Sequence, residues 1–122
     1  MKKGKLPKVK TIRNRCDALL TPIIQKLFPK CLLCGKDTEV AHHHIKKSTS
    51  SRLRYELSNL IPLCTFCHCR LHNDEILWTS RIITIKGIEW FKELDKKKSE
   101  YVKVDVHWFM SNLSRLQAIL EE

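Results

Sequence analysis

Two stretches of the sequence decide the fold: CLLCGKDTEVAHHHI at residues 31–45 and NLIPLCTFCHCRLH at residues 59–72. Each stretch carries one CxxC pair, and 29 residues separate the pairs; the paired cysteines are Cys31, Cys34, Cys64 and Cys67. Thiolate sulfur is a preferred zinc ligand, and zinc accepts a tetrahedral set of four ligands. The glycine after the first pair permits the turn that wraps two thiolates around one ion. The spacing therefore predicts a structural zinc site that closes the intervening loop.

The size and composition of the chain predict one small globular domain. It has 122 residues, of which 43% are hydrophobic and 30% charged, so a modest core gains much from a metal cross-link. No segment has the pattern of a signal peptide, and no stretch approaches the roughly 18 apolar residues of a membrane span. We therefore expect a cytoplasmic protein with no membrane partner. Thiols persist in that reducing compartment, which favours zinc ligands over disulfides.

The positive charge of the chain is concentrated in its first part. The formal net charge is +10, and residues 1–72 carry fifteen Lys and Arg against four Asp and Glu. Residues 73–122 carry eight against nine. A polyanion such as nucleic acid is the natural partner for such a surface, because each neutralised phosphate releases counterions. A merely solubilising surface is the alternative that charge alone leaves open.

The apolar pattern and the chain breakers predict an α+β domain in which helices flank the zinc site. The expected elements are a helix from Ile12 that can restart at Thr21–Pro22, a strand over 40–45, a helix over 68–77, a strand over 81–85 and supporting helices within 87–121. We expect a flexible basic tail at 1–11 and a single domain at 12–122 with its core at 31–77. The inward side chains of the last helix are predicted to be Val106, Phe109, Met110, Leu113, Leu116 and Leu120.

Five of the six histidines lie close to the cysteine pairs. His42, His43 and His44 stand inside the loop that the zinc would close, and His68 and His72 follow its second pair. A spacing of four residues places both imidazoles of the latter pair on one helix face, within reach of one metal ion. A single histidine is more often structural, but five within this segment predict a second metal site.

These residues together resemble the HNH endonuclease family. The strings CLLCG, VAHHHI and NLIPLCTFCHCRLH match its main motif elements over residues 31–72. The spacing of the basic loop, Leu-Arg-Tyr and Asn is also similar, more weakly, to the Rap-type recombination nucleases of phages. The resemblance implies a ββα-metal (His-Me finger) core, one catalytic divalent cation, a four-cysteine zinc scaffold and DNA as substrate. It also implies a role in phage recombination, packaging or restriction, in the host cytoplasm where a phage encodes the chain.

The resemblance implies a role for each matching residue. His43, His68 and His72 correspond to ligands of the catalytic ion, His44 to the general base, and Asn59 to the central asparagine that holds the loop and orients the base. The family often has Asp at the position of His43, so Mg²⁺, Mn²⁺, Ni²⁺ and Zn²⁺ all stay open as the catalytic ion.

The run of three histidines leaves a second register open. A shift by one residue makes His42 the ligand and His43 the base. Neighbouring side chains of a strand point to opposite faces, so only one register can satisfy both roles.

The implied reaction is hydrolysis of a phosphodiester bond to 5′-phosphate and 3′-hydroxyl ends. The general base takes a proton from water, while the bound ion stabilises charge on the phosphate and the departing 3′ oxygen. Basic residues that flank this centre could grip backbone phosphates; they are Lys46, Lys47, Arg52 and Arg54.

Other functions fit the same motifs. A zinc-dependent DNA-binding module without catalysis would need neither His44 nor Asn59. A structural adaptor could use His43, His68 and His72 to complete another scaffold zinc. A nuclease with one centre nicks one strand at a time, and the C-terminal helices could supply the interface of a homodimer.

Overall fold

The computed structural model describes residues 6–122, which form a mainly helical α+β arrangement. Within these residues the elements are α1 (Val9–Leu27), β1 (Val40–His43), the short 3-10 helix η1 (Leu57–Asn59), β2 (Leu60–Leu63), α2 (Thr65–Asn73), α3 (Glu75–Lys86), α4 (Ile88–Lys98) and α5 (Val106–Glu121). Residues 1–5 of the predicted tail lie outside the described residues, and its residues 9–11 already belong to α1. No helix within 6–122 is both long and apolar enough to cross a membrane.

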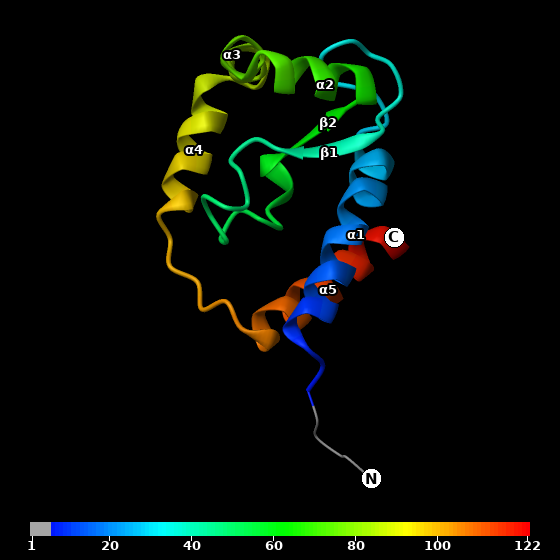
Figure 1. Cartoon of the computed structure of the whole chain (residues 1–122), viewed down its shortest axis with the longest axis vertical. Coiled ribbons are helices and arrows are strands. Elements are labelled where there is room, and N and C mark those ends of the chain that lie inside the picture. Colours follow the sequence, from blue (N-terminus) through cyan, green and yellow to red (C-terminus); the bar gives the residue numbers. More distant parts are fainter. Residues whose placement is uncertain (1–5) are drawn as a thin grey trace.

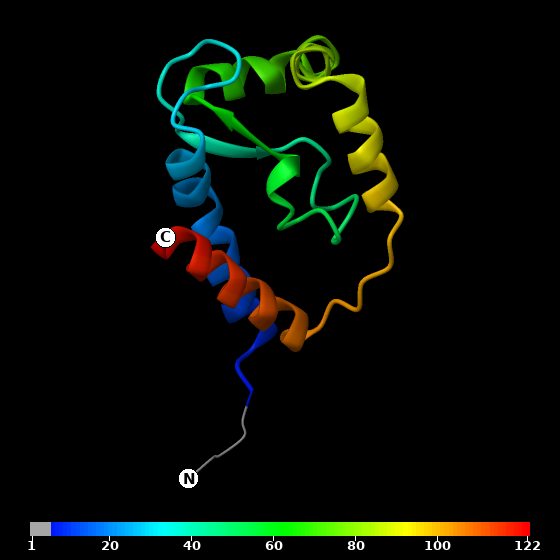
Figure 2. The same cartoon turned by 180° about the vertical axis from the view of Figure 1, so that it is seen from behind.

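Two hydrophobic clusters lie on either side of the β1–β2 hairpin. α1 packs against α5 (Figures 1 and 2), and this helix pair forms the first cluster together with Tyr55 and Leu60. The second cluster joins the cysteine pairs to α2 and α3 through Ile61, Leu71 and Ile82. Because successive strand side chains point to opposite faces, β2 contributes Leu60 to one cluster and Ile61 to the other. The hairpin is therefore the layer that separates the two clusters.

α1 is one continuous helix, so the predicted restart at Thr21–Pro22 does not occur. A proline inside a helix removes one backbone hydrogen bond. Ile23 and Ile24, directly after Pro22, are fully buried in the first cluster, and their burial offsets that loss. The Thr21 hydroxyl does not cap a helix; it accepts a hydrogen bond from the backbone N–H of Ala41 at 3.4 Å. This contact ties α1 to β1.

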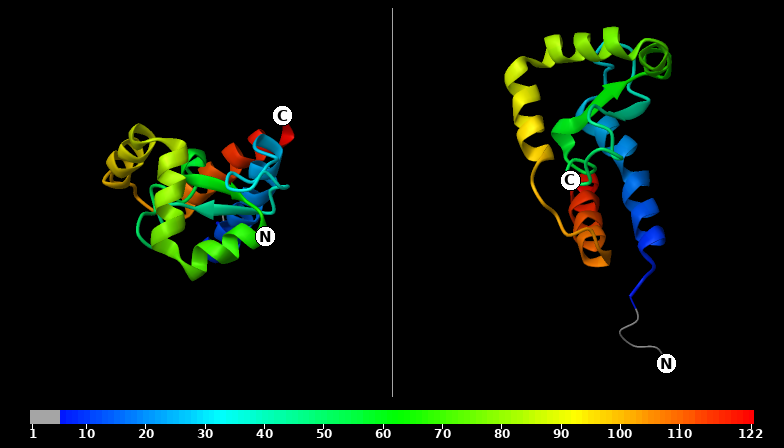
Figure 3. Two further views of the ribbon diagram at one scale, coloured as in Figure 1. Left: turned by 90° about the horizontal axis from the view of Figure 1, so that it is seen from above. Right: turned by 60° about the vertical axis from the view of Figure 1, so that its left-hand side comes forward.

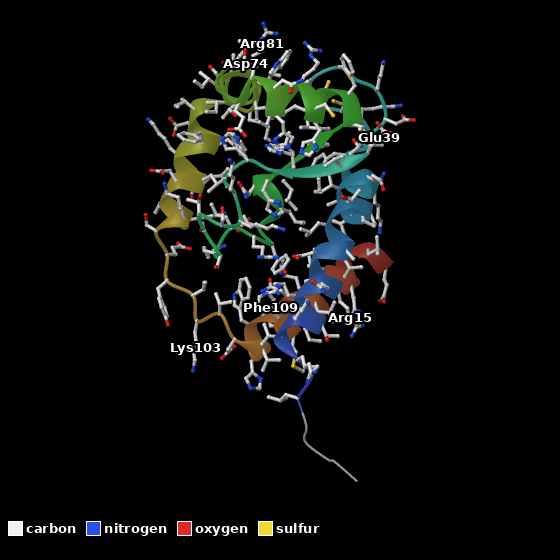
Figure 4. The ribbon with its side chains drawn as sticks, viewed as in Figure 1. Arg15, Glu39, Asp74, Arg81, Lys103 and Phe109 are labelled. Carbon is white, nitrogen blue, oxygen red and sulfur yellow. The ribbon has the colours of Figure 1, made fainter. Side chains whose placement is uncertain are left out.

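The segment after the second cysteine pair folds as two helices, and the predicted strand over 81–85 is wrong. α2 ends at Asn73, and the Asp74 carboxylate caps α3 by accepting a hydrogen bond from the backbone N–H of Leu77 at 3.3 Å. Figure 4 labels Asp74 at the junction of these helices. The β-branched residues continue α3, with Ile82 fully buried in the second cluster. Burial of one helix face thus overrides a weak intrinsic β preference.

The supporting helices α4 and α5 lie within the range predicted for them, 87–121. α3 and α4 meet at a steep angle and surround one end of the hairpin, as Figure 3 shows. The Asp105 carboxylate caps α5 by accepting a hydrogen bond from the backbone N–H of Trp108 at 2.9 Å. Phe109 and Leu116 are buried against α1, whereas Met110 is 39% exposed, so its inward assignment is wrong. Met110 lies on the side of α5 that α1 does not cover.

Candidate functional site

The first cysteine pair sits in a tight turn anchored to β2. The chain reverses at Gly35, whose φ of 79° lies in the left-handed region that favours glycine. The backbone N–H of Gly35 donates to the carbonyl of Cys31 at 3.0 Å. The backbone N–H of Leu32 donates to the carbonyl of Pro62 at 2.8 Å, which joins the turn to the hairpin. These backbone hydrogen bonds hold the turn that carries the two sulfurs.

The second cysteine pair completes a compact group of four sulfur atoms. Cys64 caps α2, and its sulfur accepts a hydrogen bond from the backbone N–H of Cys67 at 3.4 Å. The Sγ atoms of Cys34 and Cys64 are 3.6 Å apart, and all four Sγ atoms lie within 4.8 Å of one another. Zinc–sulfur bonds of about 2.3 Å in a tetrahedron place sulfurs about 3.8 Å apart. The donors therefore fit a structural metal such as zinc.

The thiols of this cluster differ in acidity. Burial tends to raise the pKa of Cys31, but backbone hydrogen bonds from the turn and from Cys64 lower it to about 7. Burial and the neighbouring thiols raise the pKa of Cys67. The four thiols therefore do not all ionise by themselves at neutral pH. A coordinated cation makes thiolates of all of them, which couples metal binding to proton release.

The histidines of β1 face different surroundings. His42 faces α2, with its ring centroid 5.3 Å from that of His68 and 6.3 Å from that of His72. The rings of His68 and His72 have centroids 4.4 Å apart and Nε2 atoms 3.1 Å apart. The structure thus brings His42, rather than His43, next to the two helix histidines.

Two of these three imidazoles, those of His42 and His68, favour their neutral form. Burial, together with the nearby His68, lowers the pKa of His42 to about 3. Burial also lowers the pKa of His68. Neutral imidazole is the form that binds a metal ion. The ligand atoms of His42, His68 and His72 are nevertheless farther apart than the cysteine sulfurs. Within residues 6–122, the cysteine group alone has all its donor atoms within 4.8 Å of one another.

The His43 ring contacts the loop that follows β1. Its Nε2 lies 2.9 Å from the backbone carbonyl of Arg54. A carbonyl oxygen only accepts, so Nε2 carries the proton and Nδ1 keeps its lone pair. Burial lowers the pKa of His43, and the bond to Arg54 opposes part of that effect. The ring is therefore oriented, neutral at pH 7 and able to accept a proton at Nδ1.

His44 packs against α4. Its ring centroid lies 4.8 Å from that of Trp90 and 5.7 Å from that of Phe91. Burial lowers the pKa of His44. Its Nδ1 is buried and has no hydrogen-bond partner among the described residues. The His44 ring is therefore packed against the aromatic side chains of α4.

The Asn59 side chain is fully buried and fastens both ends of the loop after β1. Its Oδ1 accepts a hydrogen bond from the backbone N–H of Ile45 at 2.9 Å, and its Nδ2 donates to the carbonyls of Ile45 at 3.0 Å and Leu53 at 3.2 Å. The Asn59 carbonyl accepts a hydrogen bond from the backbone N–H of His44 at 2.9 Å. Asn59 therefore acts on the histidine strand through the backbone.

The four basic residues expected to contact phosphate fall into two pairs. Lys46 and Lys47 are exposed, and the Lys46 Nζ lies 3.7 Å from the Glu75 Oε1. Arg52 and Arg54 instead engage carboxylates of the protein itself.

Arg54 belongs to a partly buried network with α1. Its guanidinium lies 2.6 Å from the Asp17 carboxylate, which also accepts a hydrogen bond from the Tyr55 hydroxyl at 2.7 Å. Burial alone would raise the pKa of Asp17, but the hydrogen bonds from Arg54 and Tyr55 lower it. Arg52 similarly contacts Glu56 and Glu100, at 3.0 and 2.9 Å. These arginines hold the loop in place.

A cavity of about 380 Å³ lies between β1 and α2. Its lining includes His42, His43, Lys46, Lys47, His68, His72 and Glu75. His44 is not part of this lining, and neither are Arg52 and Arg54. Glu75 is a lining residue that the sequence analysis did not single out. It enters the cavity only because α3 begins directly after Asp74, a helix boundary that the sequence pattern did not indicate.

Comparison with known proteins found no relatives: no family model, no curated protein and no solved structure matches the chain. The residues and their geometry therefore carry the functional assignment.

Proposed function

We propose that the chain is a metal-dependent endonuclease of the ββα-metal (HNH) kind, which hydrolyses phosphodiester bonds of DNA. The observation that carries the proposal is the cavity between β1 and α2, where His42 faces His68 and His72. Lys46 and Lys47 border the same cavity. Imidazoles that can bind a metal ion, beside exposed ammonium groups, suit a reaction on a phosphate. The four-cysteine group is the scaffold that supports the hairpin.

The ion is assigned to His42, His68 and His72, one residue earlier on β1 than the resemblance implies. The helix pair presents its Nε2 atoms to each other at 3.1 Å, and His42 is the strand histidine that faces them. Three imidazole donors suit zinc or nickel better than magnesium, which prefers oxygen ligands. A bound divalent ion would polarise the scissile phosphate and stabilise charge on the departing oxygen.

His43 is assigned as the general base. It lines the cavity, and the Arg54 carbonyl holds its Nε2–H, which leaves Nδ1 free to take a proton from water. Its lowered pKa keeps the ring neutral at pH 7. Proton transfer of this kind contributes on the order of 10² to 10⁴ in rate. His44 then packs under α4, and Asn59 holds the loop that carries the lysines.

The partner is DNA, because the excess positive charge lies in the residues that surround the cavity and precede it. One centre nicks one strand, so double-strand cutting needs a second event or a homodimer.

A zinc-dependent DNA-binding module without catalysis is the second candidate. The observation in its favour is that the cysteine donor atoms converge on one point while those of the histidines do not. Such a module would bind DNA through Lys46 and Lys47 and would not need the His43 lone pair.

Nicking of a supercoiled plasmid separates the two candidates. The parent protein is incubated with Mg²⁺, Mn²⁺, Ni²⁺ or Zn²⁺ in turn, beside the variants His68→Ala and His107→Ala. His107 is an exposed histidine of α5 and serves as the matched control. We expect nicking by the parent and by His107→Ala, and its loss in His68→Ala with partial recovery at high ion concentration. Parent protein that binds the plasmid but cuts with none of the ions would establish the binding module.

A further inference from the structure

Glu75 lies close to two other residues that line the histidine cavity, Lys46 and His72. Its Oε1 lies 3.7 Å from the Lys46 Nζ and 3.8 Å from the His72 Nδ1. One carboxylate oxygen thus lies between an ammonium group at the cavity edge and a histidine of the proposed ion site. Glu75 has these neighbours because it is the first residue of α3, where the chain turns directly after α2.

The two nitrogens of His72 have separate neighbours. Its Nε2 faces the His68 Nε2 at 3.1 Å, on the side where an ion would bind, whereas its Nδ1 faces Glu75. A histidine that ligates a metal through one nitrogen commonly donates the other N–H to a carboxylate, which fixes the ring and raises its basicity as a ligand. Glu75 is the carboxylate of this site that can take that role.

The same oxygen also neutralises Lys46. Its contact competes with any phosphate for the Lys46 ammonium, because one charge cannot be fully satisfied by both. The Glu75–Lys46 and Glu75–His72 contacts are long, and the side chains that make them are about half-exposed or more. Each contact is therefore weak, and Glu75 can exchange one for the other. A phosphate that draws Lys46 away leaves Glu75 to His72, and an ion on His72 draws Glu75 away from Lys46.

We propose that Glu75 is a positioning residue that links ion binding at His72 to phosphate binding at Lys46. The link rests on the proposed nuclease function and extends it to the coupling between ion binding and substrate binding. Because coupling between two sites is reciprocal, an ion favours phosphate binding as much as phosphate favours the ion. The protein thereby avoids a strongly held ion without substrate.

Calorimetric titration of the full chain with Ni²⁺ tests this link without any cleavage step. Zinc is measured before and after titration, so that the cysteine site is known to be unchanged. Glu75→Gln is compared with Glu89→Gln, which removes the same charge from the first turn of α4 beside Lys92 only. We expect Ni²⁺ affinity to fall about 10- to 100-fold in Glu75→Gln. In Glu89→Gln it stays at the parent value.

A second pair of variants tests the competition for the carboxylate. Lys46→Met frees Glu75 for His72, so Ni²⁺ binds more tightly than in the parent, whereas Lys103→Met, at an exposed lysine outside the cavity lining, leaves the affinity unchanged. Equal Ni²⁺ affinity in Glu75→Gln and the parent overturns the role of Glu75 alone. Equal affinity in Lys46→Met and Lys103→Met overturns the link to phosphate. A parent that binds no Ni²⁺ beyond its zinc overturns the proposed histidine site, and the nuclease function with it.

Discussion

The cysteine group and the histidine group lie on the same hairpin but are built differently. The cysteines are held by a glycine turn and a helix cap, and all but the exposed Cys34 are buried within the second hydrophobic cluster. The histidines come from a strand and a helix that border a cavity also lined by Lys46 and Lys47. Structural zinc sites are closed by protein ligands, whereas catalytic sites keep an open position. The comparison therefore supports a division of roles in which the cysteine group stabilises the fold and the histidine group carries the proposed chemistry.

Breaking the cysteine group should have the largest effect. Cys64→Ser removes one zinc ligand, and structural zinc binding couples on the order of 10 kcal/mol to folding, so we expect loss of bound zinc and of cooperative thermal unfolding. Metal analysis and thermal melts measure both. Cys69→Ser, at an exposed cysteine outside the group, is the control and should behave as the parent does. A Cys64→Ser protein that melts at the parent temperature without zinc would contradict the division of roles.

The basic residues of the loop can be compared in the same way, because Arg54 stabilises the fold whereas Lys47 is exposed at the cavity. Arg54→Met breaks the partly buried contact with Asp17 and should lower the free energy of unfolding by about 1–3 kcal/mol. Lys47→Met removes an exposed charge at the cavity, so it should leave unfolding unchanged but weaken DNA binding and reduce the salt slope by about one ion. Denaturant titration and salt-dependent fluorescence anisotropy measure the two effects. Reversal of the pattern, with Lys47→Met unstable and Arg54→Met weak in DNA binding, would refute it.

Protonation of His42 at acid pH should lower the free energy of unfolding by a smaller amount than loss of the zinc site. The pKa of His42 is about 3 in the folded protein, against about 6.5 in an unfolded chain, so the unfolded state binds the proton first. Stability is therefore complete above about pH 6.5 and falls as the pH is lowered toward 3. His42 alone should contribute a loss of about 1 kcal/mol between pH 7.5 and pH 5.5.

Parallel denaturant titrations of the parent and His42→Gln measure that contribution, because acid release of zinc acts on both proteins alike. The parent should lose more stability than the variant over this interval. Equal losses would show that His42 is not held neutral by its neighbours.

Local chemistry explains which features the sequence predicted. The CxxC spacing brings the two sulfurs of a pair close together, so this short-range pattern predicts the cysteine group correctly. The boundary at Asp74 was not predicted because the sequence there contains no helix breaker. The hydrogen bond from the backbone N–H of Leu77 to the Asp74 carboxylate starts α3 at this point. The strand expected over 81–85 failed because Ile82 is buried through tertiary packing, which local propensity does not describe.

The arrangement of the histidines could not be predicted from local sequence, because it depends on how distant segments pair and pack. Which of His42 and His43 faces α2 depends on the pairing of β1 with β2, in which His42 lies opposite Ile61 and His43 opposite Leu60. A shift of one residue exchanges their faces. The contacts of Glu75 similarly depend on where α3 starts. The residue types were therefore predictable, and the surroundings of each histidine, on which the proposed ligand and base assignments rest, were not.

The comparison of His43→Ala with His44→Ala tests the central claim most directly. Each variant is assayed for plasmid nicking, for Ni²⁺ binding by calorimetry and for DNA binding by anisotropy. If His43 is the base and His42 the ligand, His43→Ala keeps Ni²⁺ and DNA binding while its nicking rate falls on the order of 10² to 10⁴. His44→Ala then nicks at a rate near that of the parent. The opposite result, an active His43→Ala and an inactive His44→Ala that still binds Ni²⁺, would contradict the geometry and restore the register that the resemblance implies.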